Sequence, residues 1–304
     1  MNGVLLMAYG GPGRLEDVEP YLLDVRGQRP TPATLVAEVR ERYRRIGGRS
    51  PILEHTLAQA AALRAALREQ GAGCPVEVGM RHWRPRIADA LAALEAAGVT
   101  RSVGLVMAPH DSELSVGAYL RAIERAGSPL EVRAVRSWHT LPEYLSAAVE
   151  RVRSALRAWP PAERARVPVL FTAHSLPERI LAAGDPYLAQ LGETVVALRR
   201  SLPGQRVMLA FQSAGASREP WLGPEAGDVL RVLAAEGCPG ALIAPFGFTC
   251  EHVEILYDID IEYQDLAQDL GMRVARTDML NDDPALMRGL ARRVREEMRA
   301  AGWP

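Results

Sequence analysis

The sequence predicts an α/β fold of two similar Rossmann-like lobes, each a four-stranded parallel sheet flanked by helices, with a cleft between them. Short apolar, strand-like runs alternate with amphipathic helical stretches along all 304 residues. The pattern of the first half recurs in the second. Residues 107–109 resemble residues 243–245, and the run ending in Ala8-Tyr9-Gly10 resembles the one ending in Ala173-His174-Ser175. The length suits two domains of roughly 150 residues each.

The first half of the chain predicts a parallel sheet with one long insertion. Its apolar runs, expected as strands, are residues 3–8, 76–80, 103–108 and 130–135. Apolar residues recur at three- and four-residue spacing over residues 52–68 and 87–97, which predicts helices there. Residues 10–50 form an unusually long connection, and residues 18–23 and 35–43 within it look helical. Long connections in compact domains are usually functional, so we expect an ordered helical insertion near the site.

The second half repeats this organisation. Its predicted strands are residues 169–173, 207–211, 241–245 and 272–275. We place the boundary near Pro142, which gives an N-terminal lobe of residues 1–141 and a C-terminal lobe of residues 142–304. The last predicted helix, residues 284–299, is expected to pack back on the N-terminal lobe. Two such lobes create a cleft, which is a usual place for a ligand.

Composition and charge exclude several classes of protein. The formal net charge of −1 gives no electrostatic footprint for nucleic acid. No window approaches 18 uncharged apolar residues, so no membrane span is expected, and the N-terminal residues do not resemble a signal peptide. Cys74, Cys238 and Cys250 are too few and too dispersed for a disulfide framework or a four-cysteine cluster. We therefore expect a cytoplasmic protein.

The first candidate site residue is His174, which ends a buried apolar strand-like run. Ligands of open α/β sheets lie at the carboxyl ends of the strands, where a histidine can bind a metal or transfer a proton near neutral pH. The alternative is a turn histidine that only hydrogen-bonds a backbone carbonyl.

The second candidate is an acidic stretch that leaves another strand of the same half. Glu254, Asp258 and Glu262 are spaced by four residues, so in one continuous helix they would follow one face. That face is either simply solvated or, because it starts at the same sheet edge as His174, part of a metal or proton-transfer site. His252 is a further ligand or a residue that orients the loop. Cys250 is a weak metal ligand or a small buried hydrophobic residue.

Four separated motifs together resemble the ferrochelatase family. They are Ala173-His174-Ser175-Leu176-Pro177, Gln212-Ser213 followed by PWLGP at 220–224, HVEILYD at 252–258, and YRRIGGRSP at 43–51. The resemblance runs from Leu6 to the last helix. The opening Met7-Ala8-Tyr9-Gly10 is most similar to coproporphyrin ferrochelatases of Gram-positive type, which insert Fe(II) into coproporphyrin III during haem biosynthesis.

The resemblance implies a chelatase-like fold and roles for particular residues. His174 and Glu254 would be the catalytic pair that relays the metal and accepts the pyrrole protons, and Tyr9 would be an axial ligand from the opposite face of the ring. Asp258 and Glu262 resemble an outer metal site, for Mg(II) or for metal relay. His82 is an additional candidate histidine. The positions that would contact the tetrapyrrole are Tyr9, Arg26, Arg42, Tyr43, Ser50, Tyr119 and Trp221; arginine suits the propionates because it can bind carboxylates bidentately.

The sequence therefore predicts a monomeric coproporphyrin ferrochelatase, a lyase whose substrates are Fe(II) and coproporphyrin III. It carries no permanently bound cofactor, and no iron–sulfur cluster is expected because a cysteine-rich C-terminal extension is missing from the sequence. The nearest alternatives are a protoporphyrin IX ferrochelatase and a cobalt chelatase of the same fold. A non-catalytic haem-binding carrier is the alternative from a different class.

Overall fold

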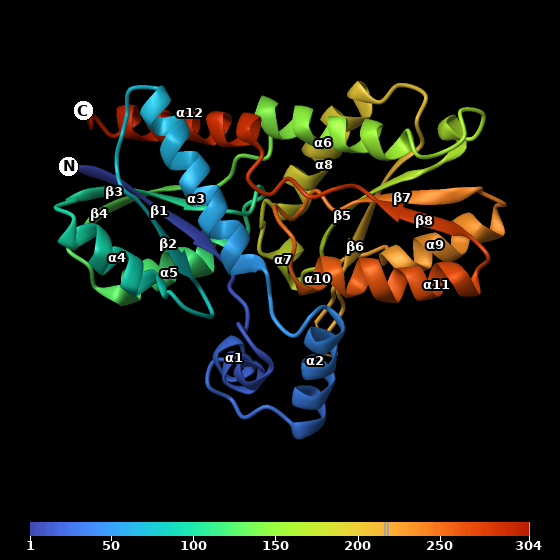
Figure 1. Ribbon diagram of the computed structural model, residues 1–304, viewed down its shortest axis with the longest axis horizontal. Coiled ribbons are helices and arrows are strands. Elements are labelled where there is room, and N and C mark those ends of the chain that lie inside the picture. The colour runs from blue at the N-terminus through green and yellow to red at the C-terminus, as the bar shows by residue number, and fades with distance from the viewer. Residues whose placement is uncertain (216, 218, 304) are drawn as a thin grey trace.

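The computed structural model of the chain describes residues 1–215, 217 and 219–303. It contains two four-stranded parallel sheets that lie side by side (Figure 1), as the sequence predicts. The N-terminal sheet has the order β2-β1-β3-β4 and the C-terminal sheet the order β6-β5-β7-β8. Each strand of the first sheet thus has a counterpart at the same place in the second, which agrees with the repeated sequence pattern.

The strands form at the predicted runs, with ends that shift by one or two residues. The strands are β1 (Asn2–Ala8), β2 (Val76–Met80), β3 (Arg101–Val106), β4 (Glu131–Val135), β5 (Val169–His174), β6 (Val207–Gln212), β7 (Gly240–Ala244) and β8 (Arg273–Arg276). The strand expected at 241–245 ends before Pro245, whose nitrogen has no hydrogen to donate to a sheet. The strand expected at 103–108 lies two residues earlier, at 101–106.

Helices cover both faces of the sheets (Figure 1). The helices are α1 (Val18–Val25), α2 (Ala33–Arg45), α3 (Ile52–Glu69), α4 (Ile87–Ala96), α5 (Val116–Ala126), α6 (Pro142–Leu156), α7 (Arg179–Ala182), α8 (Tyr187–Ser201), α9 (Ala226–Ala235), α10 (Val253–Leu256), α11 (Tyr263–Asp269) and α12 (Pro284–Ala300). Two short 3₁₀ turns, η1 (Leu15–Asp17) and η2 (Arg164–Arg166), and a π-helical turn, η3 (Asp258–Glu262), complete the elements. Within the described part of the chain, none of the helices combines the length and the apolar character needed to cross a membrane.

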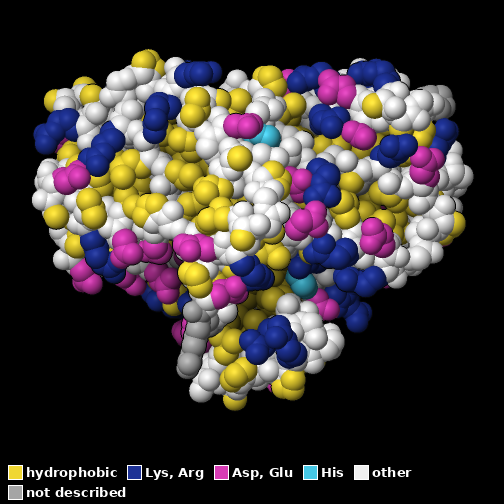
Figure 2. All heavy atoms as spheres, turned by 180° about the vertical axis from the view of Figure 1, so that it is seen from behind, with side chains coloured by type: hydrophobic (Ala, Val, Ile, Leu, Met, Phe, Trp, Pro, Cys, Tyr) yellow, Lys and Arg dark blue, Asp and Glu magenta, His cyan; other side chains and the backbone are white. Residues whose placement is uncertain are grey.

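The long connection in the first half is an ordered insertion made of α1 and α2, which project below the two lobes (Figure 1). It has a small core of its own, to which Val18, Tyr21 and Tyr43 contribute. Trp83 from the N-terminal lobe and Val253 from the C-terminal lobe pack against this core. From behind, the surface is hollowed where the insertion meets the lobes (Figure 2). The insertion therefore contacts both lobes at the carboxyl ends of their strands.

The two lobes share one hydrophobic core. Trp138 and Tyr144 from the junction of the halves belong to the same buried cluster as Phe171 and Phe246 from the C-terminal sheet. The Tyr144 hydroxyl donates to the carbonyl oxygen of Phe246 at 2.7 Å. The last helix, α12, packs across α3 of the N-terminal lobe (Figure 1). Because the core is continuous, the division of the chain near residue 142 stays a prediction.

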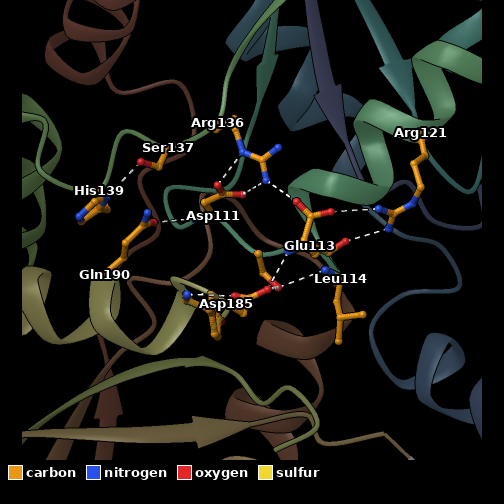
Figure 3. A network of polar contacts seen from close by, with 11 residues as sticks. Asp111, Glu113, Leu114, Arg121, Arg136, Ser137, His139, Asp185 and Gln190 are labelled. Carbon is orange, nitrogen blue, oxygen red and sulfur yellow. Dashed lines mark hydrogen bonds and ion pairs between the residues drawn. The ribbon is translucent and has the colours of Figure 1, made fainter. Parts of the chain in front are cut away.

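A polar network also joins the lobes (Figure 3). The guanidinium of Arg136 donates to Asp111 at 2.7 Å and to Glu113 at 2.6 Å. Across the junction, an Asp185 carboxylate oxygen accepts from the main-chain nitrogen of Glu113 at 2.8 Å, and the Gln190 side chain accepts from the nitrogen of Asp111 at 2.7 Å. The loop after β3 is thus held by α8 and by the segment that leads into it, and this fixes the lobes relative to each other.

Candidate active site

His174 and Glu254 meet at the carboxyl edge of the C-terminal sheet. His174 is the last residue of β5, and Glu254 lies in the first turn of α10. The imidazole Nε2 is 3.4 Å from a carboxylate oxygen of Glu254, and each side chain is about one third exposed. On its other side, the imidazole Nδ1 contacts the carbonyl oxygen of Ser175. The backbone contact considered as an alternative is therefore present, but it leaves Nε2 facing the carboxylate.

The two groups hold each other in their charged forms. Burial alone would lower the pKa of His174, but the negative charge and hydrogen bond of Glu254 outweigh it and raise that pKa to about 9. Burial alone would raise the pKa of Glu254, but the positive charge of His174 lowers it below its usual value. A metal ion can bind the imidazole only after His174 loses its proton. The pair can therefore exchange a proton for a metal.

The acidic stretch after Glu254 is not the one continuous helix that the sequence predicts. The α10 helix ends at Leu256, and the π-helical turn η3 follows before α11 begins. The carbonyl oxygen of Tyr257 accepts from the nitrogens of both Ile261 and Glu262, at 3.0 and 2.9 Å, and the second of these bonds defines the wide turn. The expectation of a regular four-residue row on one α-helical face is thus wrong. Such turns are frequently found at functional sites.

The π-helical turn places the acidic residues in different environments. Asp258 is buried, and its carboxylate accepts from the hydroxyl of Ser213 at 2.5 Å, whereas the side chain of Glu262 is 44% exposed. Burial, with the neighbouring charge of Glu254, raises the pKa of Asp258 to about 7. Asp258 can therefore gain or lose a proton near neutral pH.

Arg42 of the insertion contacts both outer carboxylates. Its guanidinium lies 3.7 Å from Asp258 and 3.9 Å from Glu262, and its central carbon lies 5.0 Å from the centre of the Tyr257 ring. No group of three or more His, Cys, Asp or Glu side chains that could hold a metal is found among the described residues. A metal at this outer position would have to compete with Arg42.

Tyr9 follows β1 on the N-terminal lobe, and its side of the site includes His82. Tyr9 is 39% exposed, its ring lies 4.6 Å from that of His82, and the guanidinium of Arg81 lies 5.7 Å from the ring centre. Burial raises the pKa of Tyr9 to about 12, against the effect of Arg81, and Glu254 contributes to the rise. Tyr9 and Glu254, from different lobes, are thus close enough for their charges to interact.

His82 contacts Tyr9 on one side and the insertion on the other. Its Nδ1 lies 2.9 Å from the carboxylate of Asp24 in α1. Burial, and the positive charge of Arg81, lower the pKa of His82 to about 4, so the ring is neutral at physiological pH. His82 therefore links the insertion to the ring of Tyr9.

Three of the residues expected to contact a tetrapyrrole are buried in the protein. Tyr43 lies in the core of the insertion beside Tyr21, and Tyr119 lies in α5 with Arg81 over its ring at 5.7 Å. The nitrogen of Ser50 donates to the carbonyl oxygen of Pro12 at 2.8 Å. In this conformation these side chains support the walls of the site.

Arg26, Arg42 and Trp221 are more accessible. The Nε atoms of Arg26 and Arg42 are buried and have no hydrogen-bond partner among the described residues. An unsatisfied buried donor costs about 1–3 kcal/mol of stability. A carboxylate ligand that accepted a hydrogen bond from these atoms would relieve that cost. The indole nitrogen of Trp221 donates to the Ser217 hydroxyl at 3.1 Å.

His252 lies near the His174–Glu254 pair, since its charge and those of the pair affect one another, whereas Cys250 is a buried residue of the preceding loop. His252 packs edge-on against Phe248, with ring centres 4.8 Å apart, and its Nδ1 has no partner among the described residues. Cys250 is buried, and burial raises the pKa of its thiol to about 12, so it is a neutral thiol at physiological pH. Of the two roles considered for Cys250, a weak metal ligand or a small buried hydrophobic residue, this environment agrees with the second.

Sequence reasoning assigned no role to several residues that hold the site. Gln212 and Ser213, quoted above only as part of a motif, contact the backbone of Glu254 and the side chain of Asp258. The Tyr187 hydroxyl donates to the carbonyl oxygen of His174 at 2.9 Å. The available signal was position: Gln212 directly follows the strand predicted at 207–211, and in the structure it ends β6 beside His174.

Two equivalent parallel sheets with a histidine–carboxylate pair at the carboxyl edge define a chelatase-type α/β protein. The solved structure of SirB from Bacillus subtilis with Fe3+ matches the chain with a TM-score of 0.60 and 14% identity, over 99% of this chain and 97% of that one. This likeness concerns the fold alone. A sequence profile of the ferrochelatase family matches residues 1–298. The chain belongs to the ferrochelatase family, and it is a metal chelatase, a lyase.

Similar proteins carry two different names. Proteins named Ferrochelatase from Herpetosiphon aurantiacus and Deinococcus radiodurans are each 41% identical to the chain, covering 94% and 95% of it and 95% and 93% of their own lengths. A protein named Coproporphyrin III ferrochelatase from Geobacillus kaustophilus is 36% identical, over 95% of this chain and 93% of its own length. The family is thus established, and the two names differ in the porphyrin they specify.

Proposed function

We propose that the protein inserts Fe(II) into coproporphyrin III. The reaction replaces two pyrrole protons by one Fe(II) ion, so it needs a ligand that releases the metal and groups that accept two protons. The observation that carries the proposal is the His174–Glu254 pair, 3.4 Å apart at the sheet edge. Imidazole and carboxylate suit Fe(II).

Each residue of the pair has a definite part in this proposal. The arriving Fe(II) displaces the proton that Glu254 stabilises on His174, and solvent takes that proton. Transfer of Fe(II) to the ring then frees the imidazole, which accepts a pyrrole proton at Nε2, while the Glu254 carboxylate accepts the other. Asp258, with its pKa of about 7, and the exposed Glu262 form the approach for Fe(II). Tyr9 would approach the ring metal from the other face.

The choice of coproporphyrin rests on its four propionates. Arg26 and Arg42 are half-buried cations of the insertion, and their Nε atoms have no hydrogen-bond partner among the described residues, so a carboxylate-rich ligand that displaced their neighbours would supply one. The similarity to proteins named Coproporphyrin III ferrochelatase supports the same choice. Protoporphyrin IX, with two propionates, is the alternative substrate, and a cobalt chelatase is the alternative of different metal preference.

An anaerobic assay with purified protein tests this proposal. Fe(II) is supplied with coproporphyrin III, protoporphyrin IX or sirohydrochlorin, Co(II) is used in parallel, and the Soret band of the metallated product is followed. We expect the largest kcat/KM for Fe(II) with coproporphyrin III. Preference for protoporphyrin IX, or for Co(II) and sirohydrochlorin, would assign the alternative activity. Tight binding of ferric haem without any metal insertion would instead indicate a carrier.

The proposal also includes the state in which the protein acts. We propose a cytoplasmic monomer with no permanently bound cofactor and no iron–sulfur cluster, in which Mg(II) can occupy the Asp258–Glu262 position when Arg42 moves away. Light scattering at assay concentration tests the monomer, and metal analysis of the purified protein tests the absence of iron and labile sulfide.

A further inference from the structure

Gln212 occupies a central place beside the His174–Glu254 pair without belonging to it. It is the last residue of β6 and is the register partner of His174 in β5. Its side chain is completely buried, with 0% exposure. A buried amide at this position needs partners for its oxygen and its nitrogen, and the identity of these partners indicates its role.

Three hydrogen bonds of Gln212 join the two elements that carry the pair. Its carbonyl oxygen accepts from the nitrogen of Ser175 at 2.8 Å, and its side-chain oxygen accepts from the hydroxyl of Thr172 at 2.7 Å. Its side-chain nitrogen donates to the carbonyl oxygen of Glu254 at 2.9 Å. Gln212 thus contacts the chain on both sides of His174, through its main-chain carbonyl and its side-chain amide. The side-chain amide also bonds the backbone of Glu254.

The Glu254 backbone needs such an external contact because its own helix is short. The α10 helix has only four residues and is followed directly by the π-helical turn. One helical turn has little stability by itself, because the first turn is the costly step of helix formation. The bond from Gln212 therefore fixes a carboxylate-bearing turn that its own backbone hydrogen bonds hold only weakly.

We infer that Gln212 is a positioning residue that sets the distance between His174 and Glu254 by bonding β5 and the first turn of α10 with one buried amide. It touches neither substrate and accepts no proton. The expected effect on the rate of metal insertion rests on the proposed function. The effect on the His174–Glu254 distance does not depend on it. Thr172 shares the role, since its hydroxyl fixes which end of the amide faces Glu254.

The test replaces Gln212 by Met, which keeps the length and approximate volume but removes the side-chain hydrogen bonds to Thr172 and Glu254, and a longer one to Ser213. The matched control is Gln59→Met. Gln59 is also 0% exposed, and it also donates to a main-chain carbonyl oxygen, that of Asn281 at 3.1 Å, but it lies in α3 away from the pair. Both variants should lose stability, and a purely structural role would make them similar in every other respect.

Two measurements separate the variants. In a crystal structure of Gln212→Met we expect the Nε2–Oε1 separation to increase beyond the 3.4 Å of the parent, with no such change in Gln59→Met. In the metal-insertion assay we expect kcat of Gln212→Met to fall by about tenfold or more with little change in KM for the porphyrin, because misplacement of reacting groups lowers the chemical step. Thr172→Val should show the same effects to a smaller degree, and Thr172→Ser should retain the parent values.

An unchanged His174–Glu254 separation in Gln212→Met, with kcat equal to that of Gln59→Met, would overturn the inference. If the parent protein inserts no metal into any porphyrin, the proposed function is rejected. A longer His174–Glu254 separation in Gln212→Met would in that case still support the positioning role. The crystallographic distance and the assay therefore keep the two failures distinct.

Discussion

The guanidinium of Arg42 lies 3.7 Å from the carboxylate of Asp258, and this contact joins the insertion to the π-helical turn of the C-terminal lobe. Arg42 comes from α2, which otherwise belongs to a small separate core. The same carboxylate accepts from Ser213. Access of a metal to Asp258 and the position of the insertion are therefore linked through one side chain.

Replacing Arg42 by Met should alter the use of Fe(II) in a pH-dependent way. Arg42 lowers the pKa of Asp258, which burial and Glu254 raise to about 7. Without Arg42 that pKa rises further, so a larger fraction of Asp258 is protonated at neutral pH. We expect the apparent KM for Fe(II) to fall more steeply with pH than in the parent, because protonated Asp258 binds the metal poorly near pH 7 and the ionised carboxylate no longer has a competing cation at higher pH.

The control for this prediction is Arg45→Met. Arg45 lies over the same Tyr257 ring at 5.5 Å but pairs with Asp265. Measuring the KM for Fe(II) against pH in both variants separates loss of the Asp258 contact from loosening of the insertion. Equal pH profiles for the two variants would contradict the role given to Arg42.

The His174–Glu254 pair should make stability depend on pH above neutrality. The pKa of His174 is about 9 in the folded protein against an ordinary value of 6.5, so this contribution is complete below pH 6.5 and is lost as pH rises through 9. Glu254→Gln removes the charge that raises this pKa. In urea unfolding at pH 6 to 9.5, the decline of the unfolding free energy between pH 6.5 and 9 should be smaller in the variant. Parallel declines would contradict the assignment.

Tyr9→Phe should change the visible absorption of the bound ferric product while the protein still folds. The pKa of Tyr9, about 12, means that the phenol is protonated until a ring metal displaces its proton. In the variant, the visible absorption of a complex with the ferric product should lose the features of phenolate ligation. Tyr119→Phe, which alters another ring near Arg81, should retain them. Identical spectra for parent and Tyr9→Phe would exclude the ligand role.

Asp185→Ala should lower stability by about 1–3 kcal/mol, because it leaves the buried hydroxyl of Ser112 without its acceptor. Asp185 accepts from the Ser112 hydroxyl at 3.0 Å and from the Glu113 nitrogen at 2.8 Å across the lobe junction (Figure 3). The exposed pair of Asp228 and Arg231 gives the control, since Asp228→Ala should change stability much less. Chemical denaturation measures both, and an equally small effect of the two changes would show that the junction does not depend on Asp185.

The sequence predicts the two sheets well because most strands are distinct apolar runs, and the edge strands β4 and β8, which carry charged residues, still follow from the alternation of strands and helices. His174 and Glu254 could be brought together from sequence because both follow strands of the same parallel sheet, whose carboxyl ends share one edge. That argument needs only the order of elements.

The rest depends on contacts that no local pattern encodes. The spacing of Glu254, Asp258 and Glu262 fits a regular α-helix, and nothing in those residues signals that the Tyr257 carbonyl oxygen accepts from both Ile261 and Glu262. Likewise, no sequence pattern around Arg42 predicts its pairing with Asp258, because Asp258 lies in another lobe. The burial of Tyr43 follows from the insertion having its own core.

The most direct test of the account is the initial rate at which Fe(II) enters coproporphyrin III, measured anaerobically for the parent and for His174→Ala. Because the pair supplies both the metal ligand and a proton acceptor, we predict that the variant loses at least about a hundredfold in kcat while still binding the porphyrin. A His174→Ala protein that inserts Fe(II) at the parent rate would contradict the central claim.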